Sequence, residues 1–439
     1  MSEPTPPPPV APPDPGLPPV EPPSAQLMVR LFLVPGLIVA GLVLLFLAGP
    51  YLSRLIGFSS EDSRTADQFL RQLDSENLDI RYRAASDLAQ VLLRKDELAA
   101  DPVFALELAS RLHDALERSK EEERKLAAGY EGMTAGERAK TEKAREPDRT
   151  LAMFLSACLG NCIVPAGAPL LCEQAKQARG MEAGALVERR RRALFALSTL
   201  GDRLKRFDAL DDEKKDAILA KLKEAEGTPG HADRPRKTRE YLAARRAGKA
   251  DSMGVVDALE AAAGDGDPFI REAAAFAANF WTGDAKEESR LEDMLLRLSR
   301  DGGEGEDRLA ERRKEGGEDP RAIREVTTRK GFTIQANATL ALARRGSPKT
   351  RLDLLEELLS PEVLRKVFVM QSAGRDEKPN EELVSVTVVG ALRATAELAK
   401  KRPGMKLGDL AKRVEELRSG YAAGITKEAD AAAEALGKR

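Results

Sequence analysis

Histidine and aromatic residues are scarce in this chain of 439 residues. It contains two histidines, and Phe, Trp and Tyr together make up 4% of its residues. Two histidines leave little material for histidine-based catalysis. Large aromatic side chains hold helices apart, whereas abundant Ala, Leu, Arg and Glu favour closely packed helices. The composition therefore predicts an all-α fold.

An excess of positive charge is also lacking. The chain has 70 Lys and Arg against 72 Asp and Glu, which gives a formal net charge of -2. Proteins that bind nucleic acid through its phosphates usually carry a basic excess. The composition therefore argues against nucleic acid as a partner. A surface rich in both signs is instead typical of helices that carry ion pairs between residues four positions apart.

Cysteine is rare, and its spacing fits neither a disulfide framework nor a zinc site. The three cysteines are Cys158, Cys162 and Cys172, an odd number that is expected of a reducing compartment. Zinc normally takes four ligands, and neither histidine lies near the cysteines in the sequence. Because the apolar segment Leu151–Leu155 leads into them, we expect buried core residues, with no bound metal or cofactor.

The N-terminal segment is rich in proline. Residues 1–26 contain twelve prolines. Proline fixes φ and removes a backbone donor, so such a segment favours extended polyproline II and cannot close a core. We predict a disordered tail over residues 1–26.

One long apolar run follows the tail. No charged residue occurs from Leu31 to Ser53, and about 20 apolar residues suffice to cross the hydrocarbon core of a bilayer. We predict a single transmembrane helix within residues 27–57, with residues 31–53 in the lipid bilayer. The alternative is a cleaved secretory signal. It is disfavoured because no basic cluster precedes the run and Phe46-Leu47-Ala48 is a poor cleavage site.

Basic residues are more frequent after this run than before it. Arg30 precedes it, whereas Arg54, Arg64 and Arg71 follow within about 20 residues, the distance over which basic residues bias a flank toward the cytoplasm. We therefore predict a single-pass membrane protein whose large C-terminal helical region is cytoplasmic.

A motif recurs along residues 62–439. It consists of an apolar residue, a small residue four positions later, and a small or apolar residue four positions after that. On a helix these positions form one stripe, and the small residue lets a neighbouring helix cross closely. Around Ala274 we expect Ala274 at the crossing and Glu272 on the outer face. The copies are Ile80/Ala84/Leu88, Ile270/Ala274/Ala278, Ile334/Ala338/Leu342, Val386/Gly390/Ala394 and a degraded one with Arg190, Ala193, Ala196 and Leu197.

The segment Asp267-Pro268-Phe269-Ile270-Arg271 resembles the second helix of a HEAT (armadillo-like) repeat, whose pattern runs Asp-x-x-Val-Arg. Here Asp267 can cap the helix and Pro268 fits its first turn. The resemblance implies antiparallel helix pairs stacked into a right-handed solenoid that serves as a binding scaffold. The alternative is an ordinary helical domain whose Ala-rich helices imitate one another.

The spacing of the copies is uneven. The aligned positions 80, 189, 270, 334 and 386 are separated by 109, 81, 64 and 52 residues, whereas HEAT repeats recur every ~40 to 47 residues. Extra helices or unrecognised units must therefore lie between the copies.

Glycine and charge mark two interruptions of the repeats. Residues 117–147 are dense in Glu, Lys and Arg, and we predict a charged insertion there within the helical repeats of residues 62–300. Glycine-rich, charged residues 301–328 are predicted to form a loop. Residues 329–439 are predicted to form the C-terminal repeats.

The sharpest charge cluster is Arg189, Arg190, Arg191 and Arg192. Four adjacent arginines point around most of a helix turn, so at least one must lie against the packed side. The cluster is a candidate contact for an acidic partner, lipid headgroups or nucleic acid, and a basic run from Arg234 to Arg246 would extend it if the two meet. The alternative is a solvated face neutralised by nearby Asp and Glu, which a chain without a basic excess favours.

Sequence motifs for common enzyme chemistries are missing. The chain has no Walker phosphate loop, no Gly-x-Ser-x-Gly and no His-Glu-x-x-His. We assign no catalytic residue and predict a membrane-anchored, non-catalytic scaffold for protein–protein interaction. The alternative is a membrane-tethered binder of an anionic polymer or lipid through the arginine-rich segments. A lyase-type enzyme is a third, because relatives of HEAT proteins include phycobilin lyases.

Overall fold

The computed structural model describes residues 65–129, 134–176, 183–231, 233–303, 325–327, 331–371 and 378–437. These residues contain 18 helices and three short strands, which confirms the all-α prediction. The predicted tail (1–26) and transmembrane helix (27–57) lie outside the described residues. Within the described ranges, no helix is long and apolar enough to cross a bilayer.

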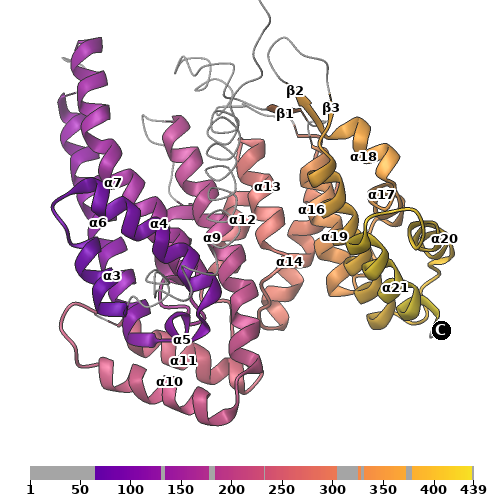
Figure 1. Cartoon of the computed structure of the whole chain (residues 1–439), viewed down its shortest axis with the longest axis horizontal. Helices are drawn as coiled ribbons and strands as arrows, with labels where there is room; N and C mark the ends of the chain where they lie inside the picture. Colours follow the sequence, from indigo (N-terminus) through magenta and orange to yellow (C-terminus); the bar gives the residue numbers. More distant parts are fainter. Residues whose placement is uncertain are drawn as a thin grey trace, which may run out of the picture. The chain divides into compact units, whose positions relative to one another are not determined.

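The helices pack in two rows that follow the sequence order (Figure 1). Each first-row helix contacts the next one and packs against a second-row helix. The first row is α4 (Leu78–Arg94), α7 (Ala135–Asn161), α9 (Ala183–Ala209), α13 (Pro268–Ala277), α16 (Phe332–Arg345), α19 (Glu381–Lys401) and α21 (Ala423–Gly437). The second row is α3 (Ala66–Leu73), α6 (Pro102–Gly129), α8 (Ala168–Lys176), α12 (Val255–Ala263), α14 (Ala285–Leu298), α17 (Leu352–Leu358) with α18 (Pro361–Val367), and α20 (Gly408–Leu417). This serial packing is consistent with a helical solenoid.

Additional helices explain the uneven spacing of the motif. The pair α6–α7 lies between the copies at positions 80 and 189, and α7 carries no copy. A further pair, α10 (Asp212–Ala225) and α11 (Arg234–Arg246), lies between the copies at 189 and 270, and α10 packs against α6. The single turn α5 (Asp96–Ala99) precedes α6. The predicted insertion 117–147 falls on the C-terminal part of α6 and the N-terminal part of α7.

The motif marks buried stripes in only some of its copies. Ile270, Ala274 and Ala278 are fully buried, as expected. Ile80 and Val386, however, are 47% and 63% exposed, so their predicted place in a buried stripe is wrong. Ile80 lies in the first turn of α4, and no earlier first-row helix is described that would cover it. In α19 the buried stripe runs through Val384, Val388 and Leu392 instead.

Helix α13 begins as its sequence predicts. The Asp267 carboxylate accepts a hydrogen bond from the Phe269 backbone N–H at 2.8 Å, and Pro268 occupies the first turn. Because an N-cap side chain satisfies a donor that the helix leaves unpaired, this geometry fixes where α13 starts.

The residue that follows the first motif position has a constant role in four helix pairs. It donates a hydrogen bond to a carbonyl at or just after the C-terminal end of the second-row helix in its own pair. Such carbonyls have no partner within their helix, and a cation beside them also interacts favourably with the helix dipole. The bonds are Arg81 to Ser75 O (3.0 and 2.7 Å), Arg190 to Ala175 O (3.0 Å), Arg271 to Asp265 O (2.8 Å) and Gln335 to Asp301 O (2.7 Å).

Two of these arginines also bind the next helix pair. Arg190, which is 5% exposed, donates to the carboxylate of Asp265 at 2.6 Å. Arg271, which is 8% exposed, makes a two-pronged ion pair with Asp301 at 2.7 and 3.1 Å. Asp265 and Asp301 therefore each accept hydrogen bonds from residues of two successive helix pairs. In each aspartate the backbone carbonyl accepts one of these bonds and the side-chain carboxylate accepts the other. We call this chain of contacts the arginine ladder.

Arginines also bind carbonyls at the opposite, C-terminal ends of the first-row helices. The buried Arg203 of α9 donates to Leu92 O at 2.9 Å and to Asn161 O at 3.0 Å, at the C-terminal ends of α4 and α7. Arg402, just after α19, donates to Gly346 O, just after α16, at 2.6 Å. Hydrogen bonds between helix pairs therefore occur at both ends of the first-row helices.

Three strands form a small antiparallel sheet. They are β1 (Glu325–Thr327), β2 (Val369–Gln371) and β3 (Lys378–Pro379), in the order β1-β2-β3. Val326 pairs with Met370, and Thr327 with Val369. The predicted loop 301–328 is therefore wrong at residues 325–327. The β-branched residues of β1 favour an extended backbone once β2 offers a partner.

The ladder predicts a large cost for losing Arg271. In Arg271→Ala the partly buried Asp301 carboxylate loses its cation, so the free energy of unfolding should fall by about 3 kcal/mol. Arg271→Lys should also destabilise, because an ammonium cannot span Asp301 and the Asp265 carbonyl together. Urea unfolding of the fragment 62–439, followed by fluorescence of the single tryptophan, measures both. Arg300→Ala, at an exposed position, is the control and should change stability by less than about 0.5 kcal/mol. An equal effect of the Arg271 and Arg300 variants would contradict a stabilising ladder.

Candidate interaction surface

The four predicted contact arginines do not form one surface. Arg190 is buried within the ladder, as the expectation that one arginine must lie against the packed side required. Arg192 is half exposed and pairs with Glu188 at 2.6 Å. Arg189 is partly buried. Arg191 lies over the rings of two phenylalanines, described below. The four arginines Arg189–Arg192 therefore lie in different surroundings.

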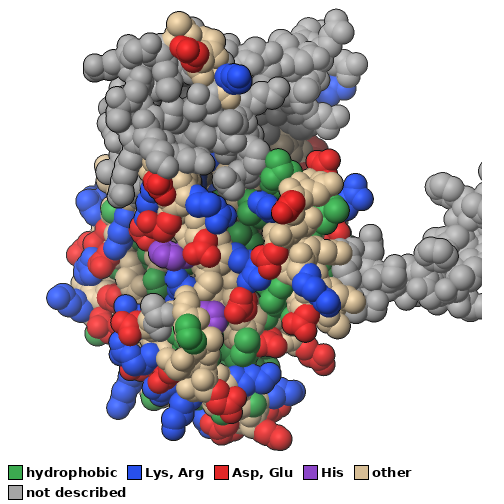
Figure 2. All heavy atoms as spheres, turned by 90° about the vertical axis from the view of Figure 1, so that its left-hand side faces the viewer, with side chains coloured by type: hydrophobic (Ala, Val, Ile, Leu, Met, Phe, Trp, Pro, Cys, Tyr) green, Lys and Arg blue, Asp and Glu red, His purple; other side chains and the backbone are tan. Residues whose placement is uncertain are grey.

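The second basic run is largely paired with carboxylates of α9, of α10 and of the residue that follows α10. Its ion pairs include Arg239–Glu226, Arg245–Asp208 and Arg246–Asp216, at 2.5 to 2.6 Å. Asp208 lies 16 residues beyond Arg192 on α9, which is about 24 Å along a helix. Arg245 is therefore remote from Arg192. Figure 2 looks onto the end of the structure that holds α3, α6 and α7, and acidic and basic side chains are intermixed there.

A row of partly exposed phenylalanines crosses from α9 to α13. The Phe195 and Phe276 rings meet edge to face with centroids 5.6 Å apart, and Phe276 meets Phe280 in the same way at 5.3 Å. The Arg191 guanidinium lies 5.3 Å from the Phe195 ring and 5.6 Å from that of Phe269. We call Phe195, Phe269, Phe276 and Phe280, together with Arg191, the aromatic surface.

Helical spacing explains why these rings reach solvent. Phe269, Phe276 and Phe280 lie seven and four residues apart, so they share one side of α13 and its C-terminal end, while Ile270 and Ala274 face the core. Beside the surface, Asn279 donates to Asn337 O at 3.3 Å and accepts from Arg344 at 3.1 Å, which joins the end of α13 to α16. The aromatic surface itself lies on α9, on α13 and just after the C-terminal end of α13.

Glu272 lies within this surface and not on a solvated outer face, so the expectation from sequence is wrong. The side chain is partly buried. Burial raises the pKa of the Glu272 carboxyl, and the charge of Arg191 lowers it by a smaller amount. The physical reason is its place on α13: one turn before Phe276, it shares that turn with large rings that exclude water.

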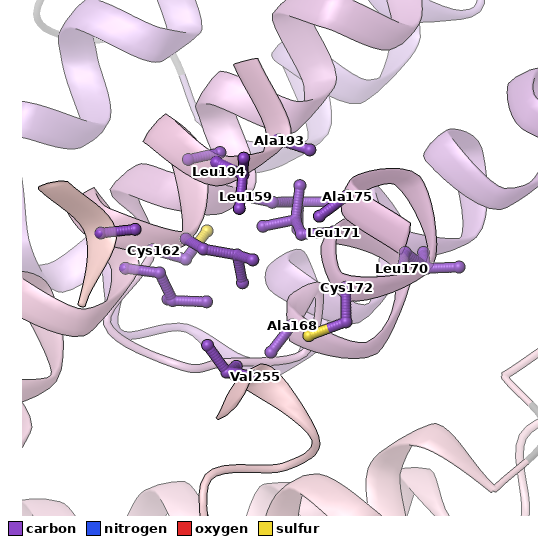
Figure 3. Close-up of a cluster of buried hydrophobic side chains, with 14 of the residues drawn as sticks. Leu159, Cys162, Ala168, Leu170, Leu171, Cys172, Ala175, Ala193, Leu194 and Val255 are labelled. Carbon is purple, nitrogen blue, oxygen red and sulfur yellow. The ribbon is translucent and has the colours of Figure 1, made fainter. Parts of the chain in front are cut away.

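The three cysteines are core residues. Cys158, Cys162 and Cys172 are buried and unpaired. Figure 3 shows Cys162 and Cys172 inside a cluster of leucine and alanine side chains. Burial raises the pKa of both thiols to about 12, so neither carries a reactive thiolate at neutral pH. In the described parts of the chain, no three His, Cys, Asp or Glu side chains are placed to hold a metal ion.

Sequence reasoning missed a cluster around His231. The His231 Nδ1 atom lies 3.1 Å from Ser110 Oγ, and its Nε2 atom lies 3.5 Å from a Glu107 carboxylate oxygen. The order resembles a hydrolase triad, but His231 is 4% exposed and Arg234 donates to the same hydroxyl at 3.2 Å. Both ring nitrogens of His231 thus have partners on α6, and these contacts join α6 to the start of α11. The two partners are 121 residues apart, and no local signal in the sequence marks them.

Comparisons with known proteins leave the function open. No protein-family model matches the chain, and no curated protein sequence matches it. Among solved structures, the chain is similar to an engineered protein whose crystal structure comes from the Northeast Structural Genomics Consortium. The match has 16% identity and covers 85% of this chain and 98% of the other, with a TM-score of 0.22. At that score the likeness carries no argument about fold or function.

The raised pKa of Glu272 makes a pH-dependent prediction. The folded state favours the protonated carboxyl, so ionised Glu272 costs stability at neutral pH, and the cost disappears as the pH falls below the ordinary value of 4.5. Glu272→Gln should therefore raise the urea midpoint at about pH 7 and leave it unchanged at about pH 4. A lower midpoint for Glu272→Gln at neutral pH would mean that attraction to Arg191 outweighs burial.

Proposed function

We propose that this chain is a membrane-anchored, HEAT-like scaffold that binds a protein partner through the aromatic surface. The observation that carries the proposal is the row of four partly exposed phenylalanines, in a chain with only 13. Aromatic and arginine side chains concentrate the binding energy of protein interfaces. The row also has a rigid base, because its rings stand on two packed helices.

The arginine ladder supports the HEAT-like part of the proposal. Arg271 follows Ile270, as the Arg of the HEAT pattern follows its apolar residue. Arg81 and Arg190 make the equivalent bond to a carbonyl at or just after the end of the second-row helix in their pair. A shared hydrogen-bonding role at a shared position favours true repeats over helices that are alike only in composition.

A partner recognised by apolar contact fits better than an anionic polymer or lipid. Of the four predicted arginines, Arg190 and Arg192 are neutralised by Asp265 and Glu188. Polyanion binding draws on cations that can release counterions from phosphates, and an arginine already paired with a carboxylate contributes little. We assign no catalytic role to any residue, and the proposed cytoplasmic location rests on Arg54, Arg64 and Arg71.

The anchor is tested by extraction of the full chain from membranes. The uncharged run Leu31–Ser53 should hold the protein in the pellet through alkaline and high-salt washes, because insertion is hydrophobic and not electrostatic. The fragment 62–439 should remain in the supernatant. Release of the full chain by either wash, or a mature N-terminus mapped just after Ala48, would refute the anchor.

The binding surface is tested by affinity capture from native membranes. Phe276→Ser removes the central ring of the aromatic surface and should reduce capture of the partner at least about tenfold, as truncation of a binding hot spot does. Because the contact is mainly apolar, capture by the unsubstituted chain should persist at high salt.

The matched control is Phe154→Ser. Phe154 is also partly exposed but lies on α7, outside the aromatic surface. Capture should survive this change, and tryptophan fluorescence should verify that both variants fold. Equal loss in the two variants, or capture that disappears with salt alone, would count against the aromatic surface.

A further inference from the structure

A cleft of about 400 Å³ lies between the first two described helix pairs, remote in sequence from the aromatic surface. It is bounded by the end of α3, the start of α4, the middle of α6 and the C-terminal half of α7. Three leucines form its apolar part, and five charged side chains line the rest. The lining residues are Leu73, Asp74, Arg81, Arg111, Asp114, Arg118, Leu151 and Leu155.

One of the three arginines is already neutralised. Arg111 makes a two-pronged ion pair with Asp74 at 3.0 and 2.7 Å, and it binds Glu107 at 2.7 Å. These contacts hold α6 against the end of α3. Arg111 therefore lines the cleft, and its charge is already neutralised by Asp74 and Glu107.

Arg81 differs from Arg111, because it makes only one of the two kinds of contact found in the arginine ladder. Like Arg190 and Arg271, it donates to a carbonyl of its own pair, Ser75 O. Arg190 and Arg271 then bind an aspartate of the next pair. Within the described residues, Arg81 has no carboxylate at ion-pair distance. Its Nη1 group, which makes no bond there, remains available in the cleft.

The length of α6 explains the missing aspartate. In the later pairs the second-row helix is short, and the turn after it supplies Asp265 or Asp301. α6 has 28 residues and continues past this level, where it presents Asp114 and Arg118 to the cleft. Both side chains are exposed, and neither makes a hydrogen bond or close ion pair within the described parts of the chain.

We propose that this cleft binds an acidic segment of a protein partner, with a carboxylate of that segment completing the ladder at Arg81. Arg118 provides a second guanidinium for the carboxylate, and an apolar side chain beside it packs on Leu73, Leu151 and Leu155. Asp114 accepts a backbone N–H from the segment and repels a doubly charged phosphate, which favours a peptide over a phosphate or lipid headgroup. The inference rests on the proposed scaffold function but uses a separate surface.

The test measures binding of two synthetic peptides to the full chain in detergent by fluorescence polarisation. One alternates Glu and Leu, and the other alternates Lys and Leu. The Glu–Leu peptide should bind saturably and at least about tenfold more tightly than the Lys–Leu peptide, and Arg118→Glu should weaken it about tenfold. Asp114→Asn should strengthen it. Arg83→Glu, at an exposed position of α4 outside the cleft, should change the affinity less than about twofold.

Each other outcome overturns the proposal. Equal binding of the two peptides, equal weakening by Arg118→Glu and Arg83→Glu, or no saturable binding would each exclude an acidic segment in the cleft. Inorganic phosphate and phosphatidylserine vesicles are the further probes, and Arg118-dependent binding of either without peptide binding would show a phosphate site instead. Phe276→Ser should leave peptide binding intact, so failure of the cleft and failure of the aromatic surface are distinguishable.

Discussion

The structure depends on arginines that satisfy the ends of helices. A second-row helix leaves its last carbonyls without partners, and burying them unsatisfied would be costly. Arg190 bonds such a carbonyl at Ala175, and Arg271 bonds the carbonyl of Asp265 in the turn after α12. Through other nitrogens of the guanidinium, the two arginines also bind Asp265 and Asp301 of the next pair. A planar guanidinium with several fixed donors can do both at once. One residue type therefore sets both the geometry within a pair and the offset between pairs.

Because the polar groups at the helix ends are hydrogen-bonded, the first-row helices can pack closely against one another. A Cβ on Gly160 would lie 2.8 Å from Ala196 O, and one on Gly201 would lie 2.8 Å from the Trp281 indole nitrogen. The indole of Trp281, which lies four residues after the end of α13, donates to Leu197 O of α9 at 2.7 Å and holds this end of α13 against α9. Little space remains for large side chains at these crossings, and Phe195 of α9 and Phe269 and Phe276 of α13 lie partly exposed beside them. The rings are held in place by this packing, which would lower the entropic cost of binding the proposed partner.

Local rules predicted α13 well and its surroundings poorly. Asp267, Pro268 and Ile270 each act as their sequence positions require, because caps, first turns and stripes depend only on neighbouring residues. The unit containing α7 was missed because it lacks the motif. The Arg190–Asp265 pair joins residues 75 positions apart, and β1 exists only through its pairing with β2. Glu272 was misplaced because its helix position alone does not reveal that phenylalanine rings shield it.

The candidate binding surfaces occur where the repeat rule is broken. Small residues at crossings are the rule, and the aromatic surface places large rings on the same helices. Arg190 and Arg271 each face an aspartate of the next pair, whereas Arg81 lacks one because α6 continues as a helix. Departures from a consistent pattern cost stability, so they persist where they serve another purpose. By the same reasoning, Arg190 is a poor candidate for contact with a partner despite lying in the most basic stretch of the sequence, because it is 5% exposed and already bonded to Ala175 O and to the Asp265 carboxylate.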